Sequence, residues 1–240
     1  MLTIDKARER VQDAVARAVR AGADAADAML VRNRSLSVSV RMGALEDVGR
    51  SESEEMGVRV FVGQRSATIS TSDLMPDALD EAVERALKMA REAPEDRWAG
   101  LAPQERLMHG APPLLDLDDG AEVEPDTLKQ RALIAEEAAR AVLGVTNSEG
   151  AGAGANRAII ALATSHGFAG SYAVTSHGLS ASVLAGSGGA MERDHAHHSA
   201  RHESMLESPE TIGTRAGQRA VARLNPARVP SGAMPVVFDP

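Results

Sequence analysis

Four histidines crowd into one short stretch of this chain: His195, His197, His198 and His202. On a strand, His195 and His197 would point to the same side, whereas on a helix His198 and His202 would share a face. Imidazoles at such spacings can hold zinc. A helical HEXXH motif is absent, because the residue after His198 is not the required glutamate. We therefore treat the four histidines as candidate metal ligands. The alternative is an exposed polar segment at a subunit contact.

Three further patterns carry residue types that can do chemistry, but each has a simpler interpretation. The glycine-rich stretch 147–156 lacks the Lys-Ser/Thr of a phosphate-binding loop, so a turn is expected there. Ser165-His166 and Ser176-His177 are adjacent pairs without a GxSxG elbow, which argues against a serine hydrolase. Both pairs lie in a repeated segment, TSHG, at 164–167 and again at 175–178. We expect the two copies to mark two turns of a meander. Asp118-Asp119 is expected to be solvated. No complete catalytic set emerges.

Composition excludes several classes of protein. The chain has 240 residues, is 43% hydrophobic and carries a net charge of −8, so a broad nucleic-acid footprint is not expected. It contains no cysteine, which excludes disulfides and thiol chemistry. The N-terminal residues lack an apolar signal core, and no apolar run approaches the ~20 residues of a membrane span. We expect a cytoplasmic protein that does not enter a membrane.

Hydrophobic periodicity predicts a mixed architecture. Apolar residues at helical spacing, with proline or capping residues before them, predict helices. These cover residues 5–21, 76–93, 125–143 and 209–224. Alternation of apolar and polar residues predicts strands. These cover residues 27–31, 36–40, 45–51, 57–62, 65–71, 157–164, 179–184 and 235–238.

The hairpin over residues 57–71 is expected to be the central element. Val58, Val60 and Val62 should share one buried face with Phe61 opposite, because side chains alternate along a strand. Gly63 allows the reversal between the two strands.

Strands cluster rather than alternating strictly with helices, which favours an α+β fold. We expect two subdomains, each mainly an antiparallel sheet with packing helices. They would cover residues 1–100 and 125–228, joined by a Pro-rich and acidic linker over residues 101–124. Residues 229–240 would begin a further C-terminal domain.

Several motifs, in order, resemble one family. The hairpin carries GVRVF at 57–61 and STSDL at 70–74. Later come TNSEG at 146–150, TSHGF at 164–168, LESPETIG at 206–213 and PVVFDP at 235–240. Together they resemble the N-terminal half of the TldD/TldE (PmbA, modulator of DNA gyrase) proteins, and the ending is similar to the TldE/PmbA branch.

The resemblance implies the N-terminal part of a non-catalytic subunit in a cytoplasmic zinc metalloprotease complex that processes or degrades unfolded peptides. Its partner would be a TldD-like protease subunit carrying an HExxxH zinc motif. No cofactor and no catalytic residue are then expected in this chain, so whether it is itself an enzyme stays open. The resemblance also implies that the chain is a fragment, and such a fragment could self-associate. The alternatives are a stand-alone binding module, or a metal-binding protein that uses His195–His202.

Overall fold

The computed structural model describes residues 2–110, 112–227 and 230–238. Within them, six strands form one antiparallel sheet in the order β3-β2-β1-β4-β5-β6. The strands are β1 (Ala25–Arg41), β2 (Ala44–Val62), β3 (Arg65–Thr71), β4 (Val145–Thr164), β5 (Ala169–Ala185) and β6 (Glu192–Ala200). The α-helices are α1 (Ile4–Arg20), α2 (Pro76–Glu92), α3 (Pro125–Arg140) and α4 (Pro209–Ala222). The α+β class is confirmed.

Each helix begins where the sequence supplies a start signal. The hydroxyl of Thr3 accepts the N–H of Lys6 at the start of α1, and that of Ser208 accepts the N–H of Thr211 in α4. Proline occupies the first turn of α2, α3 and α4, where its missing N–H costs nothing. None of the described helices combines the length and hydrophobicity that crossing a bilayer requires.

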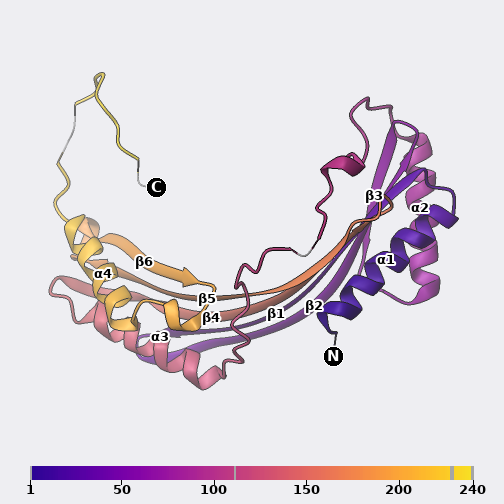
Figure 1. The fold of residues 1–240 in the computed structure, drawn as a ribbon. Helices are drawn as coiled ribbons and strands as arrows, with labels where there is room; N and C mark the ends of the chain where they lie inside the picture. The colour runs from indigo at the N-terminus through magenta and orange to yellow at the C-terminus, as the bar shows by residue number, and fades with distance from the viewer. Residues whose placement is uncertain (1, 111, 228–229, 239–240) are drawn as a thin grey trace.

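All four helices pack on one face of the sheet. On β1, the even-numbered Ala28 and Leu30 are buried with α1 and α2, while the even-numbered Val38 and Val40 are buried with α3 and α4. The molecule therefore has two hydrophobic clusters at the two ends of the same long strands. Figure 1 shows the sheet as a curved arc, with α1 and α2 near one end, α3 and α4 near the other, and none of these four helices on its inner side.

The expected central hairpin lies instead at one edge of the sheet. β3 is the outermost strand, and β1 and β4 occupy the centre. Val58 and Val60 are fully buried on the helix-bearing face, and Phe61 is 3% exposed. The alternation within the hairpin is therefore correct, but its place in the sheet is not, because β1 pairs with both β2 and the distant β4.

Three other local expectations are wrong. The stretch 147–156 is strand rather than turn, since β4 continues through it to Thr164. The second TSHG segment lies inside β5, and only the first one, at 164–167, forms a turn. Residues 235–238 form no strand, and Val237 is 95% exposed.

The segment between α2 and α3 follows the border of the sheet. The N–H of Asp96 donates to Gln64 in the β2–β3 turn, and the N–H of Thr175 on β5 donates to Leu117. One sheet thus runs through both expected subdomains. The division at residues 101–124 stays a prediction, and its second boundary, at 228–229, lies outside the described residues.

Candidate functional site on the concave face of the sheet

The face of the sheet opposite the helices, here called the concave face, is lined by small polar residues. Strand register places Asp47, Ser39, Gly152, Ser180 and His197 in one row across five strands. Side chains that face each other across antiparallel strands lie on the same side of the sheet. This row therefore presents hydroxyls, exposed backbone, one carboxylate and one imidazole to the inside of the arc.

The side chains of the next row are smaller still. In register here are Gly49, Ser37, Gly154, Gly178 and Ser199. Space here is limited on the side of Gly49, where an added Cβ would lie 2.8 Å from the Ser37 hydroxyl. Gly178, by contrast, has nothing within 4 Å of such a Cβ. The absence of side-chain bulk leaves the sheet backbone accessible from the concave side.

Two shallow hollows lie along these rows. One of about 530 Å³ is lined by residues from β1, β4, β5 and β6, including Ser37, Gly154 and His197. The other, of about 410 Å³, lies beside it and includes Glu46, Glu149 and His195. Both hollows are open to solvent and border on Ser39, Gly152 and Ser180. Such a surface can hold an extended polypeptide through hydroxyl and backbone hydrogen bonds.

The first two candidate histidines meet on this face. His195 and His197 are separated by one residue on β6, and their rings stack with centroids 5.8 Å apart. The Nδ1 atom of His195 lies 3.7 Å from the carboxylate of Asp194. Burial acts to raise the pKa of Asp194, but hydrogen bonds from Arg223 and from the backbone of His195 lower it, so this carboxylate is charged near neutral pH.

The other two candidate histidines point elsewhere. His198 lies on the helix-bearing side of β6, where its Nδ1 accepts the N–H of Glu207 at 3.3 Å. His202 follows β6, and its Nε2 lies 3.0 Å from the carbonyl of Asp116, an interaction that raises the pKa of His202. The structure thus brings together His195 and His197 alone of the four. Within the described ranges, no group of three or more His, Cys, Asp or Glu side chains is arranged to hold a metal ion.

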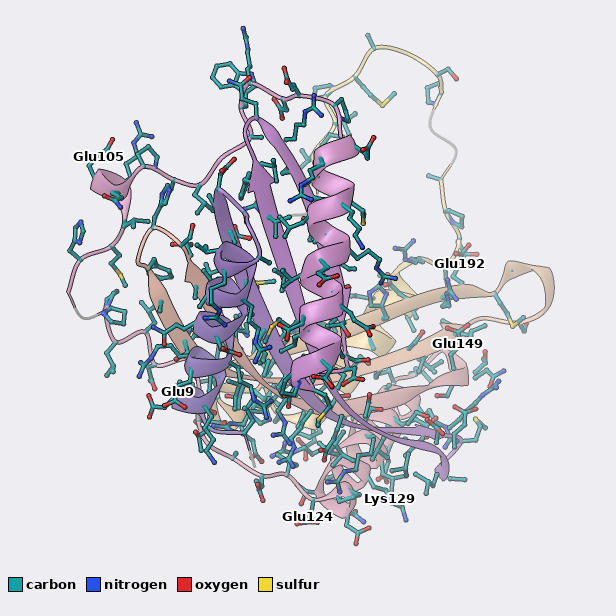
Figure 2. The ribbon with its side chains drawn as sticks, turned by 90° about the vertical axis from the view of Figure 1, so that its right-hand side faces the viewer. Glu9, Glu105, Glu124, Lys129, Glu149 and Glu192 are labelled. Atoms are coloured by element: carbon teal, nitrogen blue, oxygen red, sulfur yellow. The ribbon has the colours of Figure 1, made fainter. Side chains whose placement is uncertain are left out.

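Glu149 lies at the end of the concave face. It accepts the hydroxyl of Ser182 at 2.8 Å and a guanidinium N–H of Arg193 at 3.2 Å. The hydrogen bond from Ser182 is the main reason why the pKa of Glu149 is lowered. Figure 2 shows Glu149 and Glu192 at the same end of the sheet, far from Glu105 on the connecting segment. This end therefore carries a hydrogen-bonded ion pair, Glu149 with Arg193, beside the second hollow.

A second polar cluster, which the sequence did not reveal, is buried between the two hydrophobic clusters. His177 on β5 is 1% exposed, and its Nε2 lies 2.9 Å from the carboxylate of Asp119. That carboxylate also accepts the N–H groups of Ala121 and Glu203. The N–H of Asp119 in turn donates to the hydroxyl of Thr175. Asp119 thereby attaches the α2–α3 segment to β5 and to the residues after β6.

Asp118 makes the same attachment to β4. Both of its carboxylate oxygens accept N–H groups of Arg157, at distances of 2.6–3.1 Å. The expectation that Asp118-Asp119 is solvated is therefore wrong, since their side chains are only 21% and 11% exposed. The one available signal was the TSHG segment at 175–178, which supplies both Thr175 and His177 to this cluster. The cluster of Asp119, Thr175 and His177 is screened from solvent, so its role is to hold the α2–α3 segment against the sheet.

Comparison with protein families matches two separate regions of the chain. Residues 26–90 match the PmbA/TldA metallopeptidase domain 1, and residues 118–224 match the PmbA/TldA metallopeptidase central domain. The two matches together include all six strands except the beginning of β1.

Curated relatives extend the likeness over nearly the whole chain. It is 34% identical over 239 residues to the Metalloprotease PmbA of Escherichia coli O157:H7, covering 98% of this chain and 53% of that protein. It is also 34% identical over 232 residues to a Metalloprotease PmbA homolog of Haemophilus influenzae, covering 96% and 51%. The chain thus spans about half the length of the curated relatives it matches.

Solved structures agree. A crystal structure of a protein described as a modulator of DNA gyrase, from Bacteroides thetaiotaomicron, superimposes with a TM-score of 0.86 at 25% identity, covering 97% of this chain and 53% of that one. TldE from Thermococcus kodakarensis shares the fold, with a TM-score of 0.72 at 18% identity over 88% of this chain and 47% of that one. By its two matched domains and its curated relatives, this chain belongs to the PmbA/TldA metallopeptidase family.

Proposed function

We propose that this chain is the N-terminal part of a non-catalytic, TldE/PmbA-like subunit in a cytoplasmic zinc metalloprotease complex that processes or degrades unfolded peptides. Zinc and the catalytic residues belong to a TldD-like partner subunit in this proposal. Family membership supports the class of protein. The observation that carries the role of this chain is the concave face, a curved surface of hydroxyls and exposed backbone that none of the described α-helices covers.

Such a surface suits an unfolded chain better than a folded one. An extended peptide exposes its backbone N–H and C=O groups, which can pair with serine hydroxyls and with the sheet backbone. The small residues around Ser37, Gly154 and Gly178 impose little selection on side-chain size. In the proposed complex, the arc forms part of the wall of a space that admits peptides and excludes folded proteins by size.

A cleavage assay tests this role. The purified chain alone, with added zinc, should leave an unfolded peptide intact, whereas the full-length protein together with a TldD-like subunit should cleave it. Ser37→Trp, which fills the larger hollow, should slow that cleavage several-fold by blocking the peptide's path. Thr68→Trp, an exposed substitution on the same sheet face but outside both hollows, is the matched control. Equal rates for the two variants would contradict the proposal.

A metal-binding role is a second candidate, favoured by the stacked pair of His195 and His197. It predicts that the purified chain retains zinc on metal analysis and that His195→Ala and His197→Ala each abolish retention. His198→Ala should have no effect, because that ring faces the other side of β6.

Zinc-dependent cleavage by the chain alone would overturn the non-catalytic assignment. A third candidate, a stand-alone binding module, predicts that the chain binds peptide but ignores the TldD-like subunit.

A further inference from the structure

Strand β2 is much longer than the edge strand that pairs with it. β3 covers only Met56–Val62, and the remaining stretch Ala44–Glu55, here called the free edge, pairs with β1 on one side alone. Among the described residues, no other segment forms a backbone hydrogen bond with this stretch. Its residues are exposed or half-buried throughout. Within the described residues, the sheet therefore ends here in a strand that nothing covers.

The backbone of the free edge is ready to accept another strand. In an antiparallel strand, every second residue directs its N–H and C=O away from the partner strand. The register with β1 shifts at Glu46, which has no partner residue there, so the regular alternation runs from Asp47 to Glu55. At about 3.3 Å per residue, the outward-facing groups of this part extend over roughly 26–30 Å. Uncovered edges of this kind form a template for pairing with another extended chain.

The concave side of the free edge carries charges of one sign only. Glu46, Asp47 and Glu55 are exposed and make no ion pair with any described residue. The residues between Asp47 and Glu55 on this side of β2 are small, namely Gly49, Ser51 and Ser53. An added strand would thus meet uncompensated negative charge at both ends of a stretch without bulky side chains.

The helix-bearing side of the free edge has a different character. There, Glu52 lies 3.4 Å from Arg34, and Glu54 pairs with Arg10, so these two carboxylates are already compensated. Leu45 and Val48 lie on this side beside the buried Val40 and Val38, yet they are 47% and 46% exposed. A neighbouring strand with apolar side chains on this side would cover them.

We propose that the free edge binds an unfolded peptide by strand addition, and that the preferred peptide alternates basic and apolar residues. Basic side chains would face Glu46, Asp47 and Glu55, while apolar side chains would cover Leu45 and Val48. The inference rests on the proposed function, since the occupant is the unfolded substrate, and it names the class of sequence that this subunit selects.

Charge disfavours a second copy of the chain as the occupant. Two free edges pairing with each other would bring their acidic residues together on the concave side. Like charges placed opposite each other across a strand pair are destabilising. Exposed charged residues on an edge also protect a protein against self-pairing.

Direct peptide binding tests the proposal without any protease. The probe is a fluorescein-labelled peptide of about ten residues that alternates Lys and Val, which spans ~33 Å when extended. Its binding to the purified chain is followed by fluorescence anisotropy. A peptide alternating Glu and Val should bind at least tenfold more weakly. A Lys-Val peptide with every backbone amide N-methylated should not bind, because it has lost the donors that strand addition requires. Equal binding of the N-methylated peptide would overturn the inference.

Variants locate the site. Combined Glu46→Gln, Asp47→Asn and Glu55→Gln should weaken Lys-Val binding about tenfold and reduce its dependence on salt. The matched control, combined Glu84→Gln, Glu92→Gln and Glu105→Gln, removes three exposed carboxylates elsewhere and should leave binding unchanged. Equal weakening in both triple variants would mean that overall charge, rather than the free edge, attracts the peptide, and would contradict the proposal.

The two proposals fail in different ways. If the purified chain does not bind the Lys-Val peptide while the full-length protein still supports cleavage by a TldD-like subunit, the free edge is not the peptide site and the proposed function stands. If the free edge binds the peptide as described but the full-length protein has no effect on that cleavage, strand addition stands and the proposed function fails.

Discussion

At the scale of single residues, Asp119 organises the middle of the molecule. Its carboxylate joins the α2–α3 segment to His177 on β5 and to the backbone of Glu203. Burial acts to raise the pKa of this carboxyl. The N–H groups of Ala121 and Glu203 and the imidazole of His177 outweigh that effect and hold the pKa at about 2, against an ordinary value of 3.8.

This depressed pKa makes a testable contribution to stability. Because the folded state holds the carboxyl below its unfolded pKa, the stabilisation is complete above about pH 4 and is lost as pH falls through about 2. We expect Asp119→Asn to lower the free energy of unfolding at pH 7 by about 2 kcal/mol. The difference from wild type should shrink in acid. Urea unfolding at several pH values measures both effects. Glu122→Gln, on the same segment but exposed, should change little.

Val60 tests the packing of the edge hairpin. It is fully buried between β2 and the first helix pair, so Val60→Asp places a charge in an apolar cluster. We expect a loss of at least about 3 kcal/mol in the free energy of unfolding. Val48→Asp, on the same strand but 46% exposed, should stay within about 0.5 kcal/mol. Chemical denaturation compares the two, and similar losses would contradict the assignment of Val60 to the core.

Residue-level prediction worked where burial follows a local period. Val58 and Val60 could be placed from alternation alone, because apolar side chains at every second residue of a strand lie on one face. The burial of polar residues could not be predicted from spacing in this way. Glu136 is 1% exposed in α3, where its carboxylate accepts the N–H groups of Met42 and Gly43. His177 is likewise buried, and the Asp119 side chain is only 11% exposed, because distant segments meet there. No local sequence pattern predicts that contact.

At the scale of elements, two glycines let α3 and α4 approach closely. A Cβ at Gly213 would lie 2.0 Å from the carbonyl oxygen of Ala135, and one at Gly217 would lie 2.6 Å from the side chain of Val142. Gly213 and Gly217 are four residues apart, so both lie on the face of α4 that contacts α3. Glycine is unfavourable within a helix, so its presence here reflects this contact.

Gly213→Ala should therefore destabilise the protein although alanine is the better helix former. Overpacking against backbone that cannot move aside should cost about 2–3 kcal/mol. Gly178→Ala is the matched control, because its Cβ would meet nothing within 4 Å. That variant should be neutral or slightly stabilising, since alanine loses less backbone freedom on folding. Thermal unfolding of the two variants distinguishes packing from propensity.

Helices were easier to locate from sequence than strands. Capping residues and prolines mark helix starts locally, so Pro76, Pro125 and Pro209 each begin a helix as expected. Strands were not predicted where serine or glycine interrupts the alternation of apolar residues, as over residues 147–156. There β4 is maintained by its ladders with β1 and β5 rather than by its own propensity. The concave face was missed for the same reason, since its small residues resemble loop sequence.

At the scale of the whole molecule, β1 and β4 belong to both hydrophobic clusters. β1 contributes Leu30 to one cluster and Val38 to the other, and β4 contributes Ile159 and Ala153 in the same way. If β1 or β4 separated from the sheet at one cluster, the other cluster would also lose side chains and backbone hydrogen bonds of that strand. The two halves matched as separate family domains are therefore expected to be coupled in stability.

We expect a single cooperative unfolding transition despite the two clusters. Ile212→Ala, in the second cluster, should lower the midpoint measured by probes in either half, by several degrees for a loss of about 2–4 kcal/mol. Scanning calorimetry, combined with fluorescence of the only tryptophan, Trp98, provides the comparison. Two resolved transitions, with only one shifted, would show instead that the expected subdomains unfold independently.

The order of the strands also has a consequence for synthesis on the ribosome. β1, β2 and β3 form successive hairpins, as do β4, β5 and β6, but the ladder joining the two sets pairs Asp27 with Thr164. At roughly 5–20 residues per second, β4 emerges on the order of ten seconds after β1. Until then one long side of β1 has no partner, which exposes the nascent chain to aggregation. Folding should wait for this late, long-range closure, and a chaperone that shields β1 should raise the yield of native protein.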